Sequence, residues 1–434
     1  MDGYPYFPLK TARRGSASLV ASPASGESWE LNKDGSALAA LCDGRRSLDE
    51  IVERVAFETG LDANLVRPRT EAAMAMLTAQ GMLWWRRSKE RWSPAPRPRL
   101  FYWDITLKCN LHCAHCVVRA GESLPSELST AECMGVLDQV AAYGASGVVF
   151  SGGEPLMRPD VLQLAARARD LGLSVQMATN GTLVTSALAR AIADLGIDVQ
   201  VSVDGPTAEV HDRFRGRPGA FDLTLAGIAR LREAGASFMI GTVLHRGNLT
   251  EIRSMYELGI RLGAHTFRPI PFIASGRGKD NAGLEPSPEE FRAATEEIRS
   301  LRASGPIPIV DQQFECSFSA QPGTSAEPGG RFGCTGASPD FSITADGDVL
   351  PCSFFEGVQA HNLRERPFAW IWENSPVLVY FRDIRADDVR GPCRSCEWFS
   401  ACLGGCPAAN FARGRMLESH IQCWVASSAQ TAHR

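Results

Sequence analysis

The chain has 434 residues, of which 44% are hydrophobic and 22% charged, values typical of a globular protein with about two to four domains. Its 45 Lys and Arg residues against 49 Asp and Glu give a net charge of −4, which argues against a general nucleic-acid binder because that role needs an excess of basic side chains. No apolar run approaches the roughly 18 residues of a membrane span and the first residues lack a signal peptide's apolar segment, so we expect a cytoplasmic protein without a membrane partner.

Residues 1–86 are predicted to form a small domain of their own. Alternating polar and apolar residues predict short strands around 16–20 and 29–31. Three helical patterns follow, at 36–42, 48–58 and 64–80. Short strands followed by three helices are typical of a winged-helix-like domain. The charged, proline-containing segment 87–99 is predicted to be a linker.

From residue 100 to 305, strand patterns alternate with helical patterns. Six strand candidates begin near Phe101, Val148, Ser174, Val199, Phe238 and Thr266. Helical patterns lie between and after them, for example at 130–143, 160–171, 183–195 and 288–303. Strands separated by helical crossovers predict a parallel sheet, and six units suit a partial (β/α)6 barrel of the TIM type in an α/β fold class.

The remaining residues, 306–434, are predicted to form a cysteine-rich iron–sulfur domain. This tail has little regular periodicity and no obvious apolar core, so metal ligation is expected to organise its fold. The chain has 13 cysteines, an odd number in a chain long enough to bury a core without crosslinks, so a disulfide framework explains them poorly. Cys42 and Cys133 stand alone in helical patterns and are interpreted as buried structural thiols.

Three cysteines, Cys109, Cys113 and Cys116, follow the first barrel strand in the segment ITLKCNLHCAHC. Their C-x3-C-x2-C spacing falls in a loop of the kind that carries barrel active sites. Three thiolates on one loop are able to hold three irons of a 4Fe–4S cluster and leave the fourth iron open to an exchangeable ligand. A zinc knuckle completed by His112 or His115 is the alternative.

The chain resembles the radical S-adenosylmethionine (SAM) enzymes, because other motifs of that family follow the cysteine loop at matching distances. The resemblance implies that Cys109, Cys113 and Cys116 hold a cluster whose open iron binds SAM. Electron transfer then cleaves SAM to a 5′-deoxyadenosyl radical that abstracts a hydrogen atom. His115 stands where the family has an aromatic residue near the adenine, and its planar ring is expected to serve there.

The segment VVFSGGEP ends the second strand candidate with Gly152, Gly153 and Glu154. Two glycines let a backbone approach a ligand closely, and an acidic side chain accepts hydrogen bonds from an ammonium group. Apart from the family, the same residues form an ordinary tight turn. The resemblance implies that they contact the SAM amino group.

Two further segments, ATNGT and VSVDG, close the third and fourth strand candidates. The residues that the resemblance places against SAM there are Asn180, Ser202, Asp204 and Arg215. Ser202 and one arginine resemble residues near the SAM carboxylate and ribose. Arg213 and Arg215 are equally interpretable as surface charges.

Seven cysteines of the tail are spaced as in the SPASM domain: Cys334, twelve residues, Gly347, four residues, Cys352, then C-x2-C-x5-C-x3-C and a final cysteine. The resemblance implies two auxiliary 4Fe–4S clusters, and three clusters with the SAM-binding one. It assigns to the first auxiliary cluster Cys334, Cys352 and Cys406. It assigns to the second Cys393, Cys396, Cys402 and Cys423.

Cys316 is left over, and two roles for it stay open. It is either a fourth ligand of the first auxiliary cluster or a free catalytic thiol that contacts the substrate or donates a hydrogen atom. Ser353 follows Cys352 at a position where sulfatase-maturating relatives have an acid, so their oxidation is not expected here.

The segment LNKDGSALAALCDGRRSLDEIVERVA, residues 31–56, resembles PqqD, the small protein that chaperones the precursor peptide in pyrroloquinoline quinone biosynthesis. Homologous modules, the RiPP recognition elements, bind leader segments of ribosomally made peptides. The resemblance implies that residues 1–86 pair an extended leader with an exposed sheet edge. A DNA-binding winged helix is the alternative, disfavoured because the few basic residues are mixed with acidic ones.

Together these resemblances imply an oxidoreductase that binds a ribosomally made precursor peptide and installs a C–C, C–S or C–O crosslink in its core. A flavodoxin- or ferredoxin-type reductant is the expected electron donor, and no nucleic acid is expected to bind. Three alternatives remain: a radical SAM/SPASM oxidoreductase acting on a small molecule or a protein side chain, a peptide epimerase, or a catalytically silent scaffold.

Overall fold

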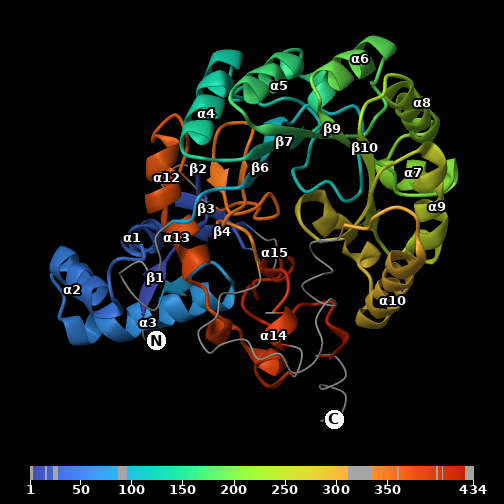
Figure 1. The fold of residues 1–434 in the computed structure, drawn as a ribbon. Helices are drawn as coiled ribbons and strands as arrows, with labels where there is room; N and C mark the ends of the chain where they lie inside the picture. Colours follow the sequence, from blue (N-terminus) through green and yellow to red (C-terminus); the bar gives the residue numbers. More distant parts are fainter. Residues whose placement is uncertain are drawn as a thin grey trace.

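The computed structural model of the protein describes residues 3–14, 17–22, 28–86, 95–310, 334–358, 361–396, 399–402 and 404–425. It confirms the predicted α/β fold class: helices cover the outer side of a curved, mostly parallel sheet, with a small module before it and a cysteine-rich region after it (Figure 1). Cys316 lies outside the described residues. Among the helices within those ranges, none has both the length and the apolar character that crossing a bilayer requires.

The central sheet contains the six predicted barrel strands. They are β6 (Leu100–Thr106), β7 (Gly147–Gly152), β8 (Ser174–Thr179), β9 (Asp198–Ser202), β10 (Phe238–Leu244) and β11 (Phe267–Pro271). Each pairs in parallel with the next, so their carboxyl ends meet at one end of the barrel. Two strands of the tail, β12 (Phe341–Ile343) and β13 (Val349–Leu350), extend the sheet beyond β6. This extension was not predicted.

Helices on the convex side of the sheet complete the partial barrel (Figure 1). They are α4 (Thr130–Ala142), α5 (Val161–Asp170), α6 (Ser186–Asp194), α7 (Ala208–Arg215), α8 (Ala220–Glu233), α9 (Ile252–Leu262) and α10 (Pro288–Ser304). Short 3-10 turns lie at Pro155–Met157, Leu249–Glu251, Gly276–Leu284, Ala386–Asp388 and Gly391–Ser395. Capping boxes at Ser129 and Ser287 fix where α4 and α10 begin.

The N-terminal module has the predicted strands and three helices. Its elements are β1 (Tyr4–Tyr6), β2 (Ala12–Arg14), β3 (Ala17–Ala21), β4 (Ser28–Leu31), α1 (Lys33–Leu41), α2 (Leu48–Thr59), α3 (Ala63–Ala79) and β5 (Trp84–Arg86). Strands β2, β3 and β4 form an antiparallel sheet with β4 at one edge. The first and last strands, β1 and β5, pair with each other and close the module.

The expectation that the tail lacks an apolar core is wrong. Its helices are α12 (Phe368–Asn374), α13 (Pro376–Asp383), α14 (Phe399–Cys402) and α15 (Pro407–Phe411). Phe368 and Trp372 are fully buried and pack against Phe341 of β12. Because β12 pairs with β6, this core continues into the barrel. The helices and strands of the tail are too short to show a periodic pattern of apolar residues along the sequence.

The N-terminal module packs directly on the tail. The ring of Trp84 in β5 lies 4.8 Å from Tyr380, 5.8 Å from Phe381 and 5.9 Å from Phe411. Arg86 forms a buried ion pair of 3.1 Å with a tail carboxylate at the end of α13, Asp383. The module is therefore part of the same packed unit as the tail.

Replacing Trp84 by Ala should lower the free energy of unfolding by about 3–5 kcal/mol, because it removes a buried aromatic ring from between two domains. Phe57→Ala is the matched control, since Phe57 lies in the same module with 81% of its surface exposed. This variant should change the free energy of unfolding little. Thermal and urea unfolding of both variants would measure this, and equal effects would contradict the packed interface.

Candidate active site at the carboxyl end of the barrel

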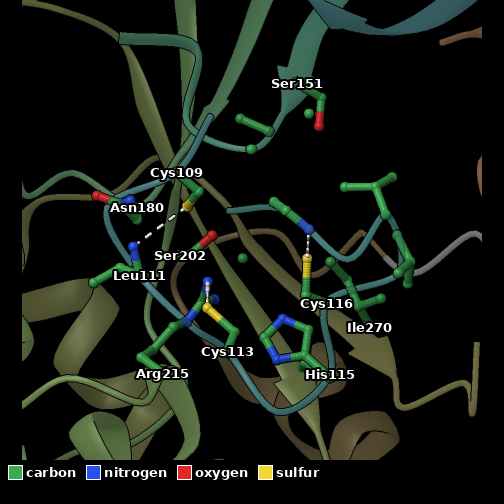
Figure 2. Close-up of a pocket in the computed structure, with 18 of the residues that line it drawn as sticks. Cys109, Leu111, Cys113, His115, Cys116, Ser151, Asn180, Ser202, Arg215 and Ile270 are labelled. Atoms are coloured by element: carbon green, nitrogen blue, oxygen red, sulfur yellow. Dashed lines mark hydrogen bonds between the residues drawn. The ribbon is translucent and has the colours of Figure 1, made fainter. Parts of the chain in front are cut away.

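The carboxyl ends of the barrel strands surround a cavity of about 240 Å³. Predicted site residues that line it are Cys109, Cys113, Cys116, Gly152, Gly153, Asn180, Ser202 and Arg215. Figure 2 shows the three cysteines, Ser202 and Arg215 around one space. The structure thus brings together residues from five separate segments. Glu154 and Asp204 are buried behind the lining and do not face the cavity.

Each cysteine sulfur of the loop after β6 receives a nearby hydrogen-bond donor. The Leu111 N–H lies 3.5 Å from Cys109 Sγ, the Ala120 N–H lies 3.2 Å from Cys116 Sγ, and Arg215 Nη1 lies 3.8 Å from Cys113 Sγ (Figure 2). Such donors favour the thiolate.

Burial has the opposite effect on two of these thiols, Cys109 and Cys113. Burial raises the pKa of Cys109 to about 11, although the hydrogen bond from the Leu111 N–H lowers it in part. Burial also raises the pKa of Cys113, and the Arg215 charge acts against that rise. Burial thus favours the protonated thiol, whereas the hydrogen-bond donors favour the thiolate. A metal ion that replaces the proton on sulfur satisfies both, so the three cysteines fit an iron–sulfur cluster. The described His, Cys, Asp and Glu side chains form no group of three around a single-ion position. In a cluster each thiolate binds its own iron, and the sulfurs stand apart.

Gly152 and Gly153 let the end of β7 dock on the cysteine loop. Gly152 has a φ of +118°, and an added Cβ there would lie 2.3 Å from the Thr106 carbonyl oxygen. A Cβ on Gly153 would lie 2.3 Å from the Lys108 carbonyl oxygen. The Gly153 N–H donates to Thr106 at 2.7 Å. The two glycines were predicted to approach a ligand closely. In this structure they approach the backbone of Thr106 and Lys108, next to Cys109.

Glu154 connects β7 to the end of β8. Its carboxylate accepts hydrogen bonds from Thr179 Oγ1 at 2.7 Å, the Asn180 N–H at 2.8 Å and the Leu156 N–H at 3.1 Å. Burial raises its pKa, and these three donors act against that rise. The carboxylate is already satisfied, and its contact with the SAM amino group stays a prediction.

An amide network that sequence reasoning missed ties the cysteine loop to the turn after β8. Asn180 Nδ2 donates to Asn110 Oδ1 at 2.9 Å, and Asn110 Nδ2 donates to Thr182 Oγ1 at 2.8 Å. Asn110 directly follows Cys109, so the network fixes the start of the loop. The only sequence signal was the adjacency of Asn110 to a cysteine.

Arg215 and Asp204 form a buried ion pair, which separates the roles of the two arginines. Arg215 Nε lies 2.5 Å from Asp204 Oδ2, with 9% and 0% of the side chains exposed. Burial is the largest single effect and pushes the Asp204 pKa upward, but the Arg215 charge, with smaller contributions from His115, His211 and the Val243 N–H, lowers the pKa overall. Arg213 is 74% exposed and pairs with Glu209 at 2.6 Å on the surface of α7. Of these two arginines, Arg215 alone lines the cavity.

His115 is a neutral, flat wall of the cavity. Its ring stacks on Phe214 at 4.4 Å with an angle of 10°, and Phe214 stacks in turn on His245 at 3.8 Å. Burial, followed by the Arg215 charge, lowers the His115 pKa to about 3. An uncharged, stacked imidazole matches the shape expected of an aromatic residue here, and its place beside the adenine stays a prediction.

Two more groups around the cavity were not predicted as site residues. Arg277 Nε donates to the Cys113 carbonyl at 2.9 Å and Nη2 to the Ala120 carbonyl at 3.0 Å, so it clamps the cysteine loop. A sequence signal for Arg277 is its place in the segment SGRG, residues 275–278, shortly after the sixth strand. Phe354 reaches the same cavity from the tail, two residues after Cys352.

The tail cysteines gather in two places. The four assigned to the second auxiliary cluster, Cys393, Cys396, Cys402 and Cys423, line one further cavity beside α10. The three assigned to the first cluster, Cys334, Cys352 and Cys406, pack against the main apolar core, where burial raises the pKa of Cys352 to about 12. The Gly336 N–H donates to Cys334 Sγ at 3.3 Å. Their roles as ligands stay predictions, and Cys316 lies outside the described residues.

Family models match three parts of the chain. The radical SAM superfamily matches residues 103–259, an iron–sulfur cluster-binding domain named SPASM matches 334–397, and coenzyme PQQ synthesis protein D (PqqD) matches 18–83. The resemblances drawn from the motifs are confirmed by these matches.

Two curated relatives align with most of the chain. AdoMet-dependent heme synthase of Methanosarcina barkeri is 36% identical over 338 residues, which are 75% of this chain and 96% of the relative. Mycofactocin maturase MftC of Mycobacterium tuberculosis is 33% identical over 344 residues, 75% of this chain and 85% of the relative.

Solved structures share the fold at low sequence identity. Streptococcus suis SuiB bound to its precursor peptide SuiA superposes with a TM-score of 0.63 and 16% identity, covering 98% of this chain and 100% of that one. Native anSMEcpe with bound AdoMet superposes with a TM-score of 0.59 and is 17% identical in sequence. The superposition covers 76% of this chain and 94% of that one.

Asp204→Asn should lower the free energy of unfolding by about 3–5 kcal/mol, because it leaves the buried Arg215 guanidinium without its counter-charge. Glu209→Gln breaks the exposed pair with Arg213 nearby and should cost less than about 1 kcal/mol. Denaturant unfolding of both variants measures the difference. A D204N protein as stable as E209Q would refute the buried pair.

Proposed function

The chain belongs to the radical SAM superfamily of enzymes, and on this premise we propose that it modifies a ribosomally made precursor peptide. The observation that carries the proposal is the PqqD module, packed through Trp84 and Arg86 against the cysteine-rich tail whose Phe354 reaches the barrel cavity. The module, the tail and the barrel form one packed unit, so a peptide bound to the module would be held on the same unit that contains the cavity. SuiB, which shares the fold, is a protein solved with its precursor peptide.

We propose that the leader adds a strand to the edge of the module's sheet at β4. Strand β4 pairs on one side with β3 and has no other strand beside it among the described residues. Its Ser28 and Glu30 side chains are exposed, while Trp29 and Leu31 pack toward the core. Backbone pairing would supply affinity, and side-chain pockets would supply selectivity.

Membership of the family implies SAM and iron–sulfur clusters as cofactors, rather than a zinc knuckle at the cysteine loop. We propose three clusters: Cys109, Cys113 and Cys116 would hold the one at the barrel, and the tail cysteines would hold two more. When bound, the first cluster and SAM supply a carbon-centred radical that takes a hydrogen atom from the substrate. A flavodoxin- or ferredoxin-type protein is the proposed reductant.

The residues of the chain would position and shield this chemistry. Gly152, Gly153 and Ser202 offer backbone and hydroxyl groups to SAM, and neutral His115 offers a flat apolar face. Arg215 holds the Cys113 side chain and is itself fixed by Asp204. The proposed product is a C–C, C–S or C–O crosslink in the core of the peptide. The enclosed site would hold the peptide next to the radical source and keep water out.

Ser353 stands at the position where sulfatase-maturating relatives have an acid, so its surroundings help to distinguish their reaction from the proposed one. Its hydroxyl hydrogen-bonds to Ser342 at 2.9 Å, and the residue does not line the barrel cavity. It thus offers neither a carboxylate nor a free hydroxyl to the substrate, in keeping with a reaction other than that of sulfatase-maturating enzymes.

A second candidate is haem formation, favoured by the 36% identity to AdoMet-dependent heme synthase. The PqqD module distinguishes the candidates, because a porphyrin needs no strand-pairing surface. Reconstituted enzyme that produces haem from an iron porphyrin, detected by absorbance, and leaves peptides unchanged would replace the peptide proposal with this one.

Triple replacement of Cys109, Cys113 and Cys116 by Ala should abolish reductive SAM cleavage and lower the bound iron from about twelve to about eight per chain, since one four-iron cluster is lost. Cys133→Ala is the control: this thiol is buried on α4, and its loss should leave the iron content unchanged. Chromatography of 5′-deoxyadenosine and iron analysis measure both. About four irons in the wild-type protein would refute the auxiliary clusters.

Leader binding is tested at the β4 edge by Glu30→Pro, which removes a backbone donor and should weaken peptide binding about tenfold or more. Glu30→Lys keeps the backbone intact and should bind almost normally. Fluorescence anisotropy with a labelled candidate peptide encoded beside the gene gives both affinities. Point variants are preferable to deleting residues 1–86, because deletion would expose the rings that Trp84 covers. Equal binding by E30P and wild type would refute strand addition.

A further inference from the structure

One arginine of the sheet, Arg268, lies on the inner side of the barrel. Along β11, side chains alternate between the two faces. Phe267 faces outward, with its ring 5.7 Å from Tyr256 on α9. Ile270 lines the barrel cavity (Figure 2), and Arg268 shares its face two residues earlier in the strand. Arg268 therefore lies about 6.6 Å deeper along the strand than Ile270.

The guanidinium is held by neutral groups. Its Nη1 donates to Gln200 Oε1 at 2.9 Å and its Nη2 to the Tyr102 hydroxyl at 3.4 Å. Gln200 also lines the barrel cavity, so the arginine stands directly behind a wall residue. Gly241 lies between them: an added Cβ would come within 2.8 Å of the Gln200 amide nitrogen. The glycine leaves room for Gln200 to lie across β10 toward Arg268.

Arg268 has no carboxylate partner among the described residues. Of the two arginines that line the cavity, Arg215 has Asp204 as its acid, and Arg277 is engaged with two backbone carbonyls of the cysteine loop. Asp104, the acid on the inner side of β6, forms no ion pair or hydrogen bond with Arg268, whose described partners are Gln200 and Tyr102. A half-buried positive charge bonded only to neutral groups retains most of its electrostatic attraction for an anion.

We propose that Arg268, supported by Gln200 and Tyr102, forms a subsite for a carboxylate group of the substrate. The subsite rests on the proposed peptide function in one respect: the carboxylate would be either the C-terminal group of the peptide or an acidic side chain of its core. An arginine fork binds a carboxylate through two parallel hydrogen bonds and so fixes its orientation. Because the arginine lies deeper than Ile270, the carbons next to that carboxylate would point toward the cavity where SAM is proposed to bind.

Small carboxylate probes test the subsite directly on reconstituted holoenzyme with SAM, without leader binding or turnover. The probes are N-acetyl-alanyl-alanine, its C-terminal amide, and N-acetyl-glutamyl-alanine amide. Dissociation constants come from calorimetric and thermal-shift titrations of wild type, Arg268→Gln and Arg253→Gln. Arg253 is the matched control, since it lies on the outer face of α9 and pairs with Glu297. Failure of the peptide function would leave this measurement intact.

The wild type should bind at least one carboxylate probe about tenfold or more tightly than the plain amide, R253Q should keep this preference and R268Q should lose it. Preference for the first probe identifies a terminal carboxylate, and preference for the third identifies an acidic side chain. If R268Q does not take up its clusters, Arg268→Lys replaces it, which keeps the charge without the fork and should reduce the preference. A wild type without preference, or a variant at Arg268 with the full preference, overturns the proposal.

Discussion

The active site depends on how a loop without helix or strand is held in place. Residues 107–129 carry three cysteines, and backbone hydrogen bonds within the loop, such as that from the Cys109 N–H to the Gly121 carbonyl at 2.8 Å, hold it in part. Neighbouring segments complete the support: β7 docks on the loop through Gly152 and Gly153, and Arg277 clamps two of its carbonyls. The glycines are thus required by close backbone packing, where any Cβ would collide. A loop fixed in this way presents its three cysteine sulfurs to one cavity.

The same dependence on neighbours extends to the other parts of the chain. The tail completes the sheet through β12 beside β6, and its Phe354 enters the barrel cavity. The N-terminal module reaches the tail through Trp84, which contacts Phe411, and Phe411 contacts Phe355 at 5.0 Å. Aromatic packing therefore links the module to the segment that carries Cys352 and Phe354.

The cysteine motifs and the barrel strands were predictable because both are local in the sequence. Spacing fixes which thiols share a loop, and alternation of strand and helix patterns fixes the parallel sheet. Features that depend on distant pairing were not predictable. The sequence offered no means of choosing between Arg213 and Arg215, because only the fold buries Asp204 beside one of them. The apolar core of the tail was missed because Phe368 and Trp372 find their partner in β12, far along the chain.

The most direct test of the account is mass spectrometry of a peptide encoded beside the gene, after anaerobic incubation with reconstituted enzyme, SAM and a one-electron reductant. The account predicts a peptide that loses two hydrogen atoms, while 5′-deoxyadenosine forms in step with the product. Formation of 5′-deoxyadenosine with an unchanged peptide, or turnover of an iron porphyrin in its place, would contradict it.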